Sequence, residues 1–466
     1  MGIFLKKTLG IISVCVLILN TLFLAPKESN AVTINTGFPQ GEMYENGGYD
    51  PNAASPVFGN WSYNSPFSGT ETNALKWEKE ITDMISYFSP TVIDKEGNIY
   101  YTTGDEEVVS IDKHGVQRWK IKLDTSANQN VAPAIGNDGT IYVAGGLSIF
   151  ALNPDGTVKW KSTPSVGTFY SSPAIGNDGT LYVQDAKEYK LYAFNGNDGS
   201  VKWISAAAVK AWDRNTSPVI DNDGTIYLRN DAFINAYDKT GALKWSYQTT
   251  NASNLTLLKD GKIAVTSYNN GSPGNVKIID RGGNLVKSFV TANSGGRFVV
   301  QNQFNDQLIV DEAYSITSFN EDGTKNWSYN TSDLTQNQPV IDKNGVIYFG
   351  SNVGKIYALK PDGTVKWQLD LKQHYGASLF KFYKGGISMD KNGSLITAGE
   401  LFKGGVFTTK IIAIGDDSVP PIDETCSGYL EQIEAKIANG TITQEEIKEA
   451  QLRLSKDLYN LSLKEN

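Results

Sequence analysis

The sequence predicts an all-β fold, an eight-bladed β-propeller of four-stranded antiparallel blades with a small C-terminal α-helical hairpin. Three observations predict it. Tryptophans recur with a period of about 40 residues, a length typical of propellers and solenoids. Each period contains four short apolar segments separated by turn residues, which makes one propeller blade. The two ends of the repeat region are incomplete in complementary ways.

Seven tryptophans, most of them directly after Lys or Arg, mark the repeats. Their intervals are 42, 41, 43, 42, 82 and 40 residues, and the double interval holds a degenerate copy at Leu285-Val286-Lys287-Ser288. At this spacing we expect the indoles to pack between neighbouring blades, each ring N–H finding a backbone acceptor; stacking on a ligand is the alternative. The tryptophans are Trp77, Trp119, Trp160, Trp203, Trp245, Trp327 and Trp367.

The turns inside each repeat predict tight hairpins. In the third copy, Asn177-Asp178-Gly179 separates the first two predicted strands, and Asn197-Asp198-Gly199 separates the last two. Asp-Gly and Asn-Gly between alternating apolar residues favour two-residue hairpins because both central residues adopt positive φ readily. The same two turns recur through the other copies, so four antiparallel strands are expected in each.

The ends of the repeat region predict a closed ring of eight blades. Leu75–Ile81 contains only a fourth, tryptophan-bearing strand, whereas residues 377–415 contain three strands, around 378–382, 394–398 and 410–414. The N-terminal strand should therefore complete the last sheet; an open solenoid is the competing arrangement. The blades are expected to start near Ser89, Val131, Ser171, Thr216, Asn254, Phe298, Gln338 and Ala377.

The repeat unit resembles a known family. Pro173-Ala174-Ile175-Gly176 with its Asn-Asp-Gly turn, together with the Asp-Gly-Thr-Val-Lys-Trp segments at 155–160 and 362–367, is similar to the PQQ-like (quinoprotein-type) propeller repeat, and the resemblance covers residues 75–415. The lead-in from Asn60 to Trp77 also resembles secreted Bacillus propellers of the YxaL type. The resemblance implies a WD40-like propeller fold. It leaves function open, because the repeat occurs both in quinoprotein dehydrogenases and in an outer-membrane assembly propeller.

The residues that the resemblance would require for quinone chemistry are missing from the sequence. The large alcohol dehydrogenases of this type place an adjacent Cys-Cys pair over the quinone, and this chain has none. The sugar dehydrogenases use a histidine base. Of the two histidines here, His114 occupies a turn position, while His374 lies in a connection between blades and could reach a ligand. We therefore expect no catalytic residues and no cofactor. The alternative is a PQQ- or sugar-dependent oxidoreductase with its site in the central channel, which could hold PQQ and calcium.

One acidic turn resembles the start of a calcium loop. Asp221-Asn222-Asp223-Gly224 offers carboxylates at alternate positions but lacks the downstream glutamate and runs directly into a strand. A hairpin turn explains the residues without a metal. No metal site is therefore predicted.

The connections between blades predict a binding surface. Blade-to-blade connections and the loops between second and third strands share one face of a propeller, and here they are long and rich in Ser, Thr, Asn and Tyr. Aromatic and Arg side chains on loops are enriched at interaction hot spots. We predict a non-catalytic scaffold that binds a protein or cell-wall component through these loops. Trp212, in the insertion 206–212, could equally fold back as a plug. The candidate contact residues are Tyr170, Trp212, Arg214, Arg297, His374 and Tyr375.

The N-terminus predicts export. Lys6 and Lys7 precede the apolar residues 8–24, and the small residues Ser29 and Ala31 then form a cleavage site. Residues 1–31 are thus expected to be a signal peptide, with an uncleaved anchor as the alternative, and the protein to be secreted or cell-wall associated without membrane contact. Cleavage would remove three lysines and one glutamate and change the net charge from −8 to −10, which argues against nucleic-acid binding.

The segments that flank the predicted propeller differ from it in composition. Residues 32–74 are rich in Gly, Asn, Pro and Ser and predict an extended arm. Residues 416–427 read as a linker, and 428–466 carry two apolar stripes at helical spacing, loosely similar to a SHOCT-type helical hairpin. So small a hairpin must dock on the propeller or self-associate. Cys426 could then cross-link two copies.

Overall fold

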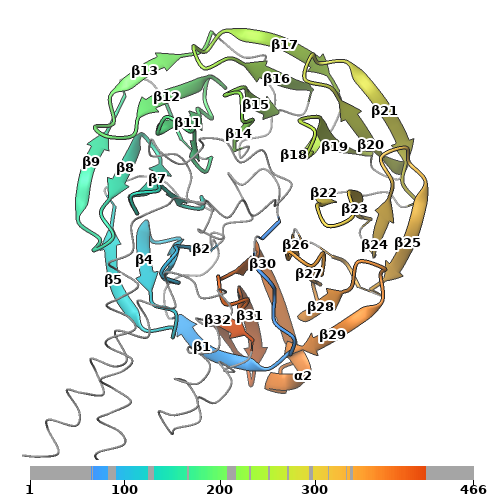
Figure 1. Ribbon diagram of the computed structural model, residues 1–466. Helices are drawn as coiled ribbons and strands as arrows, with labels where there is room; N and C mark the ends of the chain where they lie inside the picture. Colours follow the sequence, from blue (N-terminus) through green and yellow to red (C-terminus); the bar gives the residue numbers. More distant parts are fainter. Residues whose placement is uncertain are drawn as a thin grey trace, which may run out of the picture. The chain divides into compact units, whose positions relative to one another are not determined.

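The computed structural model describes residues 64–65, 67–81, 91–123, 131–164, 167–169, 171–206, 217–229, 232–249, 252–269, 272–292, 298–312, 314–331, 333–335 and 339–415. In these ranges the chain forms eight four-stranded antiparallel sheets arranged as blades around a ring (Figure 1). The predicted eight-bladed propeller is confirmed. The predicted signal peptide, Cys426 and the C-terminal helical hairpin lie outside the described residues.

Seven blades use four consecutive strands, which we term A to D from the channel to the rim (Figure 1). Blade I contains β2 (Val92–Ile93), β3 (Ile99–Thr102), β4 (Glu107–Ile111) and β5 (Gln117–Lys122). Blade II contains β6 (Ala134–Ile135), β7 (Ile141–Gly145), β8 (Ser148–Leu152) and β9 (Val158–Ser162). Blade III contains β10 (Ala174–Ile175), β11 (Thr180–Gln184), β12 (Leu191–Asn195) and β13 (Val201–Ile204). Blade IV contains β14 (Val219–Ile220), β15 (Ile226–Arg229), β16 (Phe233–Tyr237) and β17 (Leu243–Gln248).

The next three blades follow the same order, and the strands of blade V are the longest among them. Blade V contains β18 (Ala252–Leu257), β19 (Ile263–Asn269), β20 (Ser272–Ile279) and β21 (Leu285–Val290). Blade VI contains β22 (Val299–Asn302), β23 (Gln307–Asp311), β24 (Ser315–Phe319) and β25 (Lys325–Asn330). Blade VII contains β26 (Val340–Ile341), β27 (Ile347–Gly350), β28 (Lys355–Leu359) and β29 (Val365–Asp370), and the short helix α2 (Leu371–Tyr375) follows it.

Blade VIII closes the ring with the N-terminal strand. Its order is β1-β32-β31-β30, so β1 (Leu75–Ile81) is the outermost strand beside β32 (Val406–Ile414). The predicted closure is therefore confirmed. The strands are longer than expected: β30 spans Leu379–Met389 and β31 spans Leu395–Lys403, because antiparallel pairing continues to Lys403 opposite Val406.

The hydrophobic core lies between the blades. Both middle strands of a blade are covered on each face by a neighbouring sheet, so β7 is buried at every residue, whereas the outer strand β5 alternates with exposed residues. One core cluster joins Val92 and Tyr100 of blade I to Ile141 and Phe150 of blade II. Burial of such side chains stabilises each by about 1.5–3 kcal/mol relative to exposure, so each blade depends on the next for its core.

The outer-strand tryptophans pack between neighbouring blades, as predicted. The indole of Trp77 packs on Gly115 in the C–D turn of the next blade, where φ is +80° and a Cβ would lie 2.8 Å from the ring. Glycine is required there both for the backbone conformation and for the close approach. The ring N–H donates to a carbonyl of the same turn in six blades: Trp77 to Lys113 (2.7 Å), Trp119 to Pro154 (2.9 Å), Trp160 to Gly196 (2.9 Å), Trp203 to Lys239 (2.9 Å), Trp245 to Arg281 (2.8 Å) and Trp327 to Pro361 (2.9 Å).

Blade V departs from this pattern. Lys287 lies opposite Ile278 in the register that tryptophan occupies in the other blades, and Phe289, two residues later, packs on Gly323 of blade VI instead. The phenyl ring keeps the apolar contact but has no N–H to donate. The degenerate copy in the sequence thus marks a blade interface with packing and no indole hydrogen bond.

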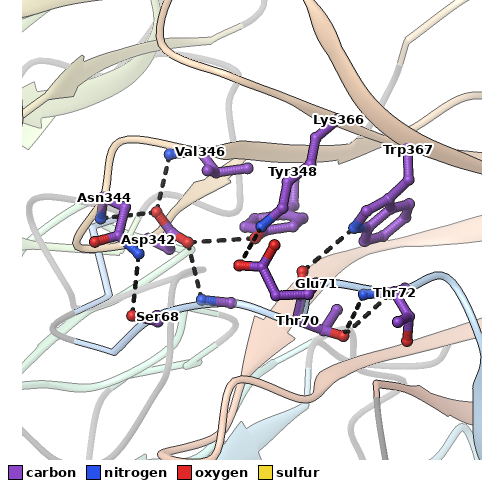
Figure 2. A network of polar contacts seen from close by, with 11 residues as sticks. Ser68, Thr70, Glu71, Thr72, Asp342, Asn344, Val346, Tyr348, Lys366 and Trp367 are labelled. Atoms are coloured by element: carbon purple, nitrogen blue, oxygen red, sulfur yellow. Dashed lines mark hydrogen bonds and ion pairs between the residues drawn. The ribbon is translucent and has the colours of Figure 1, made fainter.

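Residues 67–72 replace the missing C–D turn at the closure (Figure 2). Trp367 of blade VII donates to the carbonyl of Thr70 at 3.3 Å, where its counterparts reach a turn of the next blade. The N–H of Gly69 donates to Asp342 Oδ2 at 2.9 Å, and a Cβ on Gly69 would lie 2.3 Å from the Tyr348 hydroxyl. The arm therefore packs so closely on Tyr348 that only glycine fits at position 69.

The start of the described arm reaches a third blade. Asn64 forms a parallel bridge with Ile341 on the innermost strand of blade VII, and its Nδ2 donates to the carbonyl of Gln301 in blade VI at 2.8 Å. At the other end, a Cβ on Gly393 in blade VIII would lie 2.2 Å from the carbonyl oxygen of Ser68. Residues 64–65 and 67–70 thus contact blades VI, VII and VIII before the chain enters β1.

Candidate binding face and the hairpin of blade VIII

The propeller presents two different faces. The A–B and C–D turns lie at one, and the B–C turns with the blade-to-blade connections lie at the other, which we call the loop face. Of the six candidate contact residues, Tyr170, Trp212, Arg214 and Arg297 lie outside the described residues. His374 and Tyr375 are described and lie together on α2.

Helix α2 is a short capped turn between β29 and β30. Asp370 at its N-cap accepts a hydrogen bond from the Gln373 N–H at 2.9 Å, and Gly376 ends it with φ +58°. Figure 1 places α2 at the outer edge of the ring. The exposed His374 therefore lies at the rim of the loop face, away from the central channel where the oxidoreductase alternative would need it.

Tyr375 joins α2 to the closing strand. Its hydroxyl donates to Glu78 Oε2 at 2.6 Å, its ring stacks on Phe380 with centroids 6.0 Å apart, and the Lys410 ammonium lies 5.1 Å from the ring centroid. Burial, then the neighbouring Glu78 carboxylate, raise the pKa of Tyr375 above its ordinary value. The structure therefore shows Tyr375 as a half-buried packing residue with its hydroxyl already engaged.

Glu78 is held in its charged form. Burial alone would raise its pKa, but hydrogen bonds from Lys410 and Tyr375 outweigh burial and lower the pKa below its ordinary value. Lys410 Nζ lies 2.5 Å from Glu78 Oε1. This ion pair joins β1 to β32 at the edge of the loop face.

The long B–C hairpin of blade VIII on the loop face was not predicted from the sequence. Strand β31 has nine residues where β27 of blade VII has four. Five further residues at about 3.3 Å each extend it by roughly 16 Å. The signal was present in Phe402-Lys403-Gly404-Gly405-Val406-Phe407, a glycine pair between alternating apolar residues.

The tip of this hairpin exposes apolar side chains. Val406 is 62% exposed and Phe407 is 57% exposed. Phe402 and Phe407 are cross-strand partners with ring centroids 4.4 Å apart. Paired aromatic rings across two strands hold a hairpin in register, so the tip is an ordered apolar element.

Buried acids on the loop face hold connections in place. Asp185, in the B–C turn of blade III, accepts N–H hydrogen bonds from Thr168 and Glu188, each at 2.5 Å. Glu312, in the B–C turn of blade VI, accepts one from the Ala292 N–H at 2.6 Å. These carboxylates accept hydrogen bonds from backbone N–H groups of the preceding blade-to-blade connection or of their own turn. They therefore fix the conformation of these loops.

The acidic turn considered for calcium is held by protein groups. Asp221 Oδ2 lies 3.3 Å from Arg281 Nη2 of blade V, and Asp221 Oδ1 accepts the Asn222 N–H at 2.6 Å. Asp223 accepts the Thr225 N–H at 2.8 Å. Burial raises the pKa of Asp221 above its ordinary value. Over the described ranges, no three His, Cys, Asp or Glu side chains gather as metal ligands would.

None of the helices among the described residues is both long enough and apolar enough to cross a bilayer.

The chain matches one protein family over most of its propeller. The family model described as outer membrane protein assembly factor BamB, of the PQQ-like repeat type, matches residues 68–163, 104–256, 148–302 and 285–384. A curated relative, the uncharacterized protein YxaL of Bacillus subtilis (strain 168), is 33% identical over 73 residues. That match covers 16% of this chain and spans 18% of the relative's length.

Solved structures share the fold at low identity. The quinohemoprotein alcohol dehydrogenase from Comamonas testosteroni superposes with a TM-score of 0.58 at 12% identity, covering 79% of this chain and 81% of that one. A europium-containing methanol dehydrogenase gives 0.55 at 12% identity, covering 75% and 90%. The C-terminal WD40 domain of Sif2 gives 0.54 at 14% identity, covering 74% and 100%. These structures are similar in fold alone.

Proposed function

The chain belongs to the PQQ-like propeller family described as outer membrane protein assembly factor BamB, and we propose that it is an exported, non-catalytic scaffold that binds a protein partner through its loop face. The observation that carries this proposal is the exposure of large apolar side chains at B–C turns. Leu147 of blade II is 54% exposed and Tyr314 of blade VI is 51% exposed. Such side chains on loops are typical of interaction hot spots.

Two further features support the proposal. The family description names an assembly factor, a role carried out by contact between proteins. The N-terminal leader expected from the sequence would deliver the protein outside the cytoplasm. The buried carboxylates of the loop face are engaged by backbone N–H groups, as shown for Asp185 and Glu312, which suits a binding surface better than acid–base chemistry.

Site-specific photo-crosslinking in cells tests the scaffold. A benzophenone amino acid replaces Leu147 or Tyr314 in the full-length chain, and the matched control replaces Val116, which is 61% exposed in a C–D turn on the opposite face. We expect the same cross-linked protein from both loop-face positions and none from position 116. Absence of cross-links at 147 and 314, or equal cross-linking at 116, would reject the proposal.

A thermal-shift measurement separates the scaffold from the oxidoreductase alternative. A ligand that binds only the folded state at 100 times its dissociation constant stabilises it by about 2.7 kcal/mol. We expect PQQ with calcium to leave the melting temperature unchanged. A reproducible rise would instead favour a quinone site in the channel.

A further inference from the structure

We propose that the hairpin tip of blade VIII, residues 402–407, attaches the protein to an anionic membrane surface. This inference goes beyond the proposed scaffold, since it assigns a second contact to the loop face and leaves the B–C turns of blades II and VI for a partner. It also departs from the sequence-based expectation of no membrane contact. The geometry and the charge of the tip carry it.

The apolar part of the tip is shaped for insertion. Val406 and Phe407 are adjacent residues, and successive side chains of a strand point to opposite faces, so both faces of the tip are apolar at its end. Gly404-Gly405 forms the turn, and a Cβ on either glycine would have no neighbouring protein atom within 4 Å. A narrow projecting tip with apolar residues on both faces can insert into the headgroup region of a bilayer, because lipid contacts the tip from all sides.

A group of cationic side chains lies behind the tip. Lys372 and Lys403 are exposed, and Lys403 Nζ donates to the carbonyl of Tyr375 at 2.7 Å, which holds the base of the hairpin against α2. Lys381 is also exposed and lies opposite Glu400. With Lys410, four lysines here stand against the three carboxylates of Asp370, Glu400 and Glu78. The base of the hairpin is therefore slightly positive in a chain whose net charge is −8.

The combination favours an anionic bilayer over other partners. Apolar residues at the end of a projection with lysines behind them are typical of proteins that lie on membranes, because the apolar groups enter the interface while the cations meet anionic headgroups. A protein groove would have to cover both faces of the tip at once. An anionic polymer would use the lysines but would leave Val406 and Phe407 exposed.

Vesicle binding of the full-length protein tests the inference. The probes are vesicles of phosphatidylcholine alone and vesicles of an equal mixture of phosphatidylcholine and phosphatidylglycerol. We expect binding to the mixed vesicles, reversal at high salt, and weak binding to phosphatidylcholine. Vesicles should also slow hydrogen exchange in residues 400–408, which locates the contact independently of affinity.

Two pairs of variants separate the contributions. Val406→Ser with Phe407→Ser, and Lys372→Glu with Lys403→Glu, should each lower binding to mixed vesicles about tenfold or more. The apolar control changes Leu285 and Val290 of the rim strand to Ser, since they are 48% and 63% exposed. The charge control changes Lys287 and Lys325, also exposed on rim strands, to Glu. Both control variants should bind the mixed vesicles as tightly as the unaltered protein does. Only variants whose melting temperature equals that of the unaltered protein are compared, so that unfolding does not account for lost binding.

The outcomes are distinct from those of the scaffold test. No binding to mixed vesicles, or binding that survives Val406→Ser with Phe407→Ser, would overturn the membrane contact. Cross-linking of position 407 to a protein in cells, with no vesicle binding, would assign the tip to a protein groove instead. Neither result changes what cross-links from positions 147 and 314 mean, so the scaffold proposal is tested independently of the membrane contact.

Discussion

At the scale of single residues, six of the seven outer-strand tryptophans combine two interactions with the next blade. The indole packs on a turn glycine, and its N–H donates to a backbone carbonyl of the same turn, as Trp203 does with Gly241 and Lys239. The two contributions are separable because blade V keeps the packing through Phe289 without a donor. The interface between blades V and VI therefore keeps an aromatic ring on the turn glycine without the N–H hydrogen bond.

Trp203→Phe and Trp203→Ala should divide the two contributions. Loss of one hydrogen bond costs about 1 kcal/mol of unfolding free energy, whereas removal of the ring costs about 3 kcal/mol or more. We therefore expect a small loss for the phenylalanine variant and a large one for the alanine variant, measured by denaturant unfolding. Equal losses would show that the Lys239 carbonyl, left without its donor, dominates the interface.

A buried turn aspartate should make stability depend on pH. Burial raises the pKa of Asp390 above its ordinary value, and the N–H groups of Asn392 and Ser394 that bond its Oδ1 only partly offset this. A folded pKa above the unfolded one means that the stabilising contribution is present below the unfolded pKa and is lost as pH rises through the folded pKa.

Asp390→Asn should remove this loss, because an amide oxygen can accept the same two N–H groups without carrying charge. We expect the variant to gain melting temperature relative to the unaltered protein at neutral pH, and the gain to disappear in acid. The control is Asp362→Asn in an exposed C–D turn, where hydrogen bonds from Thr364 lower the pKa. That stability is present above the unfolded pKa and lost in acid, so the control should be destabilised at neutral pH.

At the scale of elements, outer-strand lysines link the rim to the A–B turn of their own blade. Lys159 lies 3.0 Å from Asp138 in blade II, and Lys202 lies 3.3 Å from Asp178 in blade III. In blade VII, Lys366 instead pairs with Glu71 of the N-terminal arm at 2.9 Å (Figure 2). The arm thus supplies blade VII with an acidic partner and supplies Trp367 with its carbonyl.

Gly69→Ala should loosen this arm. The new Cβ would meet the Tyr348 hydroxyl, which is fully buried and cannot move aside freely. Overpacking of this kind costs about 1–3 kcal/mol. We expect a lower unfolding midpoint together with faster proteolysis of the arm ahead of β1. The comparison variant is Glu71→Gln, which removes an ion pair whose carboxylate is largely exposed and should cost less than about 1 kcal/mol. Similar losses in both variants would show that the ion pair, and not the close packing at Gly69, holds the arm.

The periodic elements could be predicted from the sequence, and the irregular ones could not. Turn glycines, strand order and the role of the tryptophans follow from a repeated pattern, and closure follows from the unequal ends. The path of residues 64–70 over three blades depends on side-chain fit at Gly69 and Gly393, which no local pattern reports. The long hairpin was missed because Gly404-Gly405 falls outside the repeat spacing. His374 was recognised as a loop residue, but its place at the rim depends on the geometry of α2.

At the scale of the whole molecule, closure determines how the blades share stability. The core clusters lie between adjacent blades, including one that joins Ile99 and Tyr101 of blade I to Ile396 and Ile411 of blade VIII. In an open array of repeats, the end units have one neighbour and unfold more easily than the interior ones. In the closed ring every blade has two neighbours, so no blade is expected to act as a weak end.

A chain that begins after Ile81 should therefore lose cooperativity as well as stability. It lacks β1, the Trp77 contact with blade I and the Glu78 ion pair with Lys410. The full-length protein should unfold in one calorimetric transition, with equal calorimetric and van't Hoff enthalpies for the propeller. The truncated chain should unfold over a broader range, with a van't Hoff enthalpy below the calorimetric one. A chain that begins at Asn64 keeps the arm and β1 and should match the full-length transition. If the chain beginning after Ile81 instead unfolds in one sharp step, the core between blades alone would account for cooperativity, and the ring would not need its N-terminal strand for that purpose.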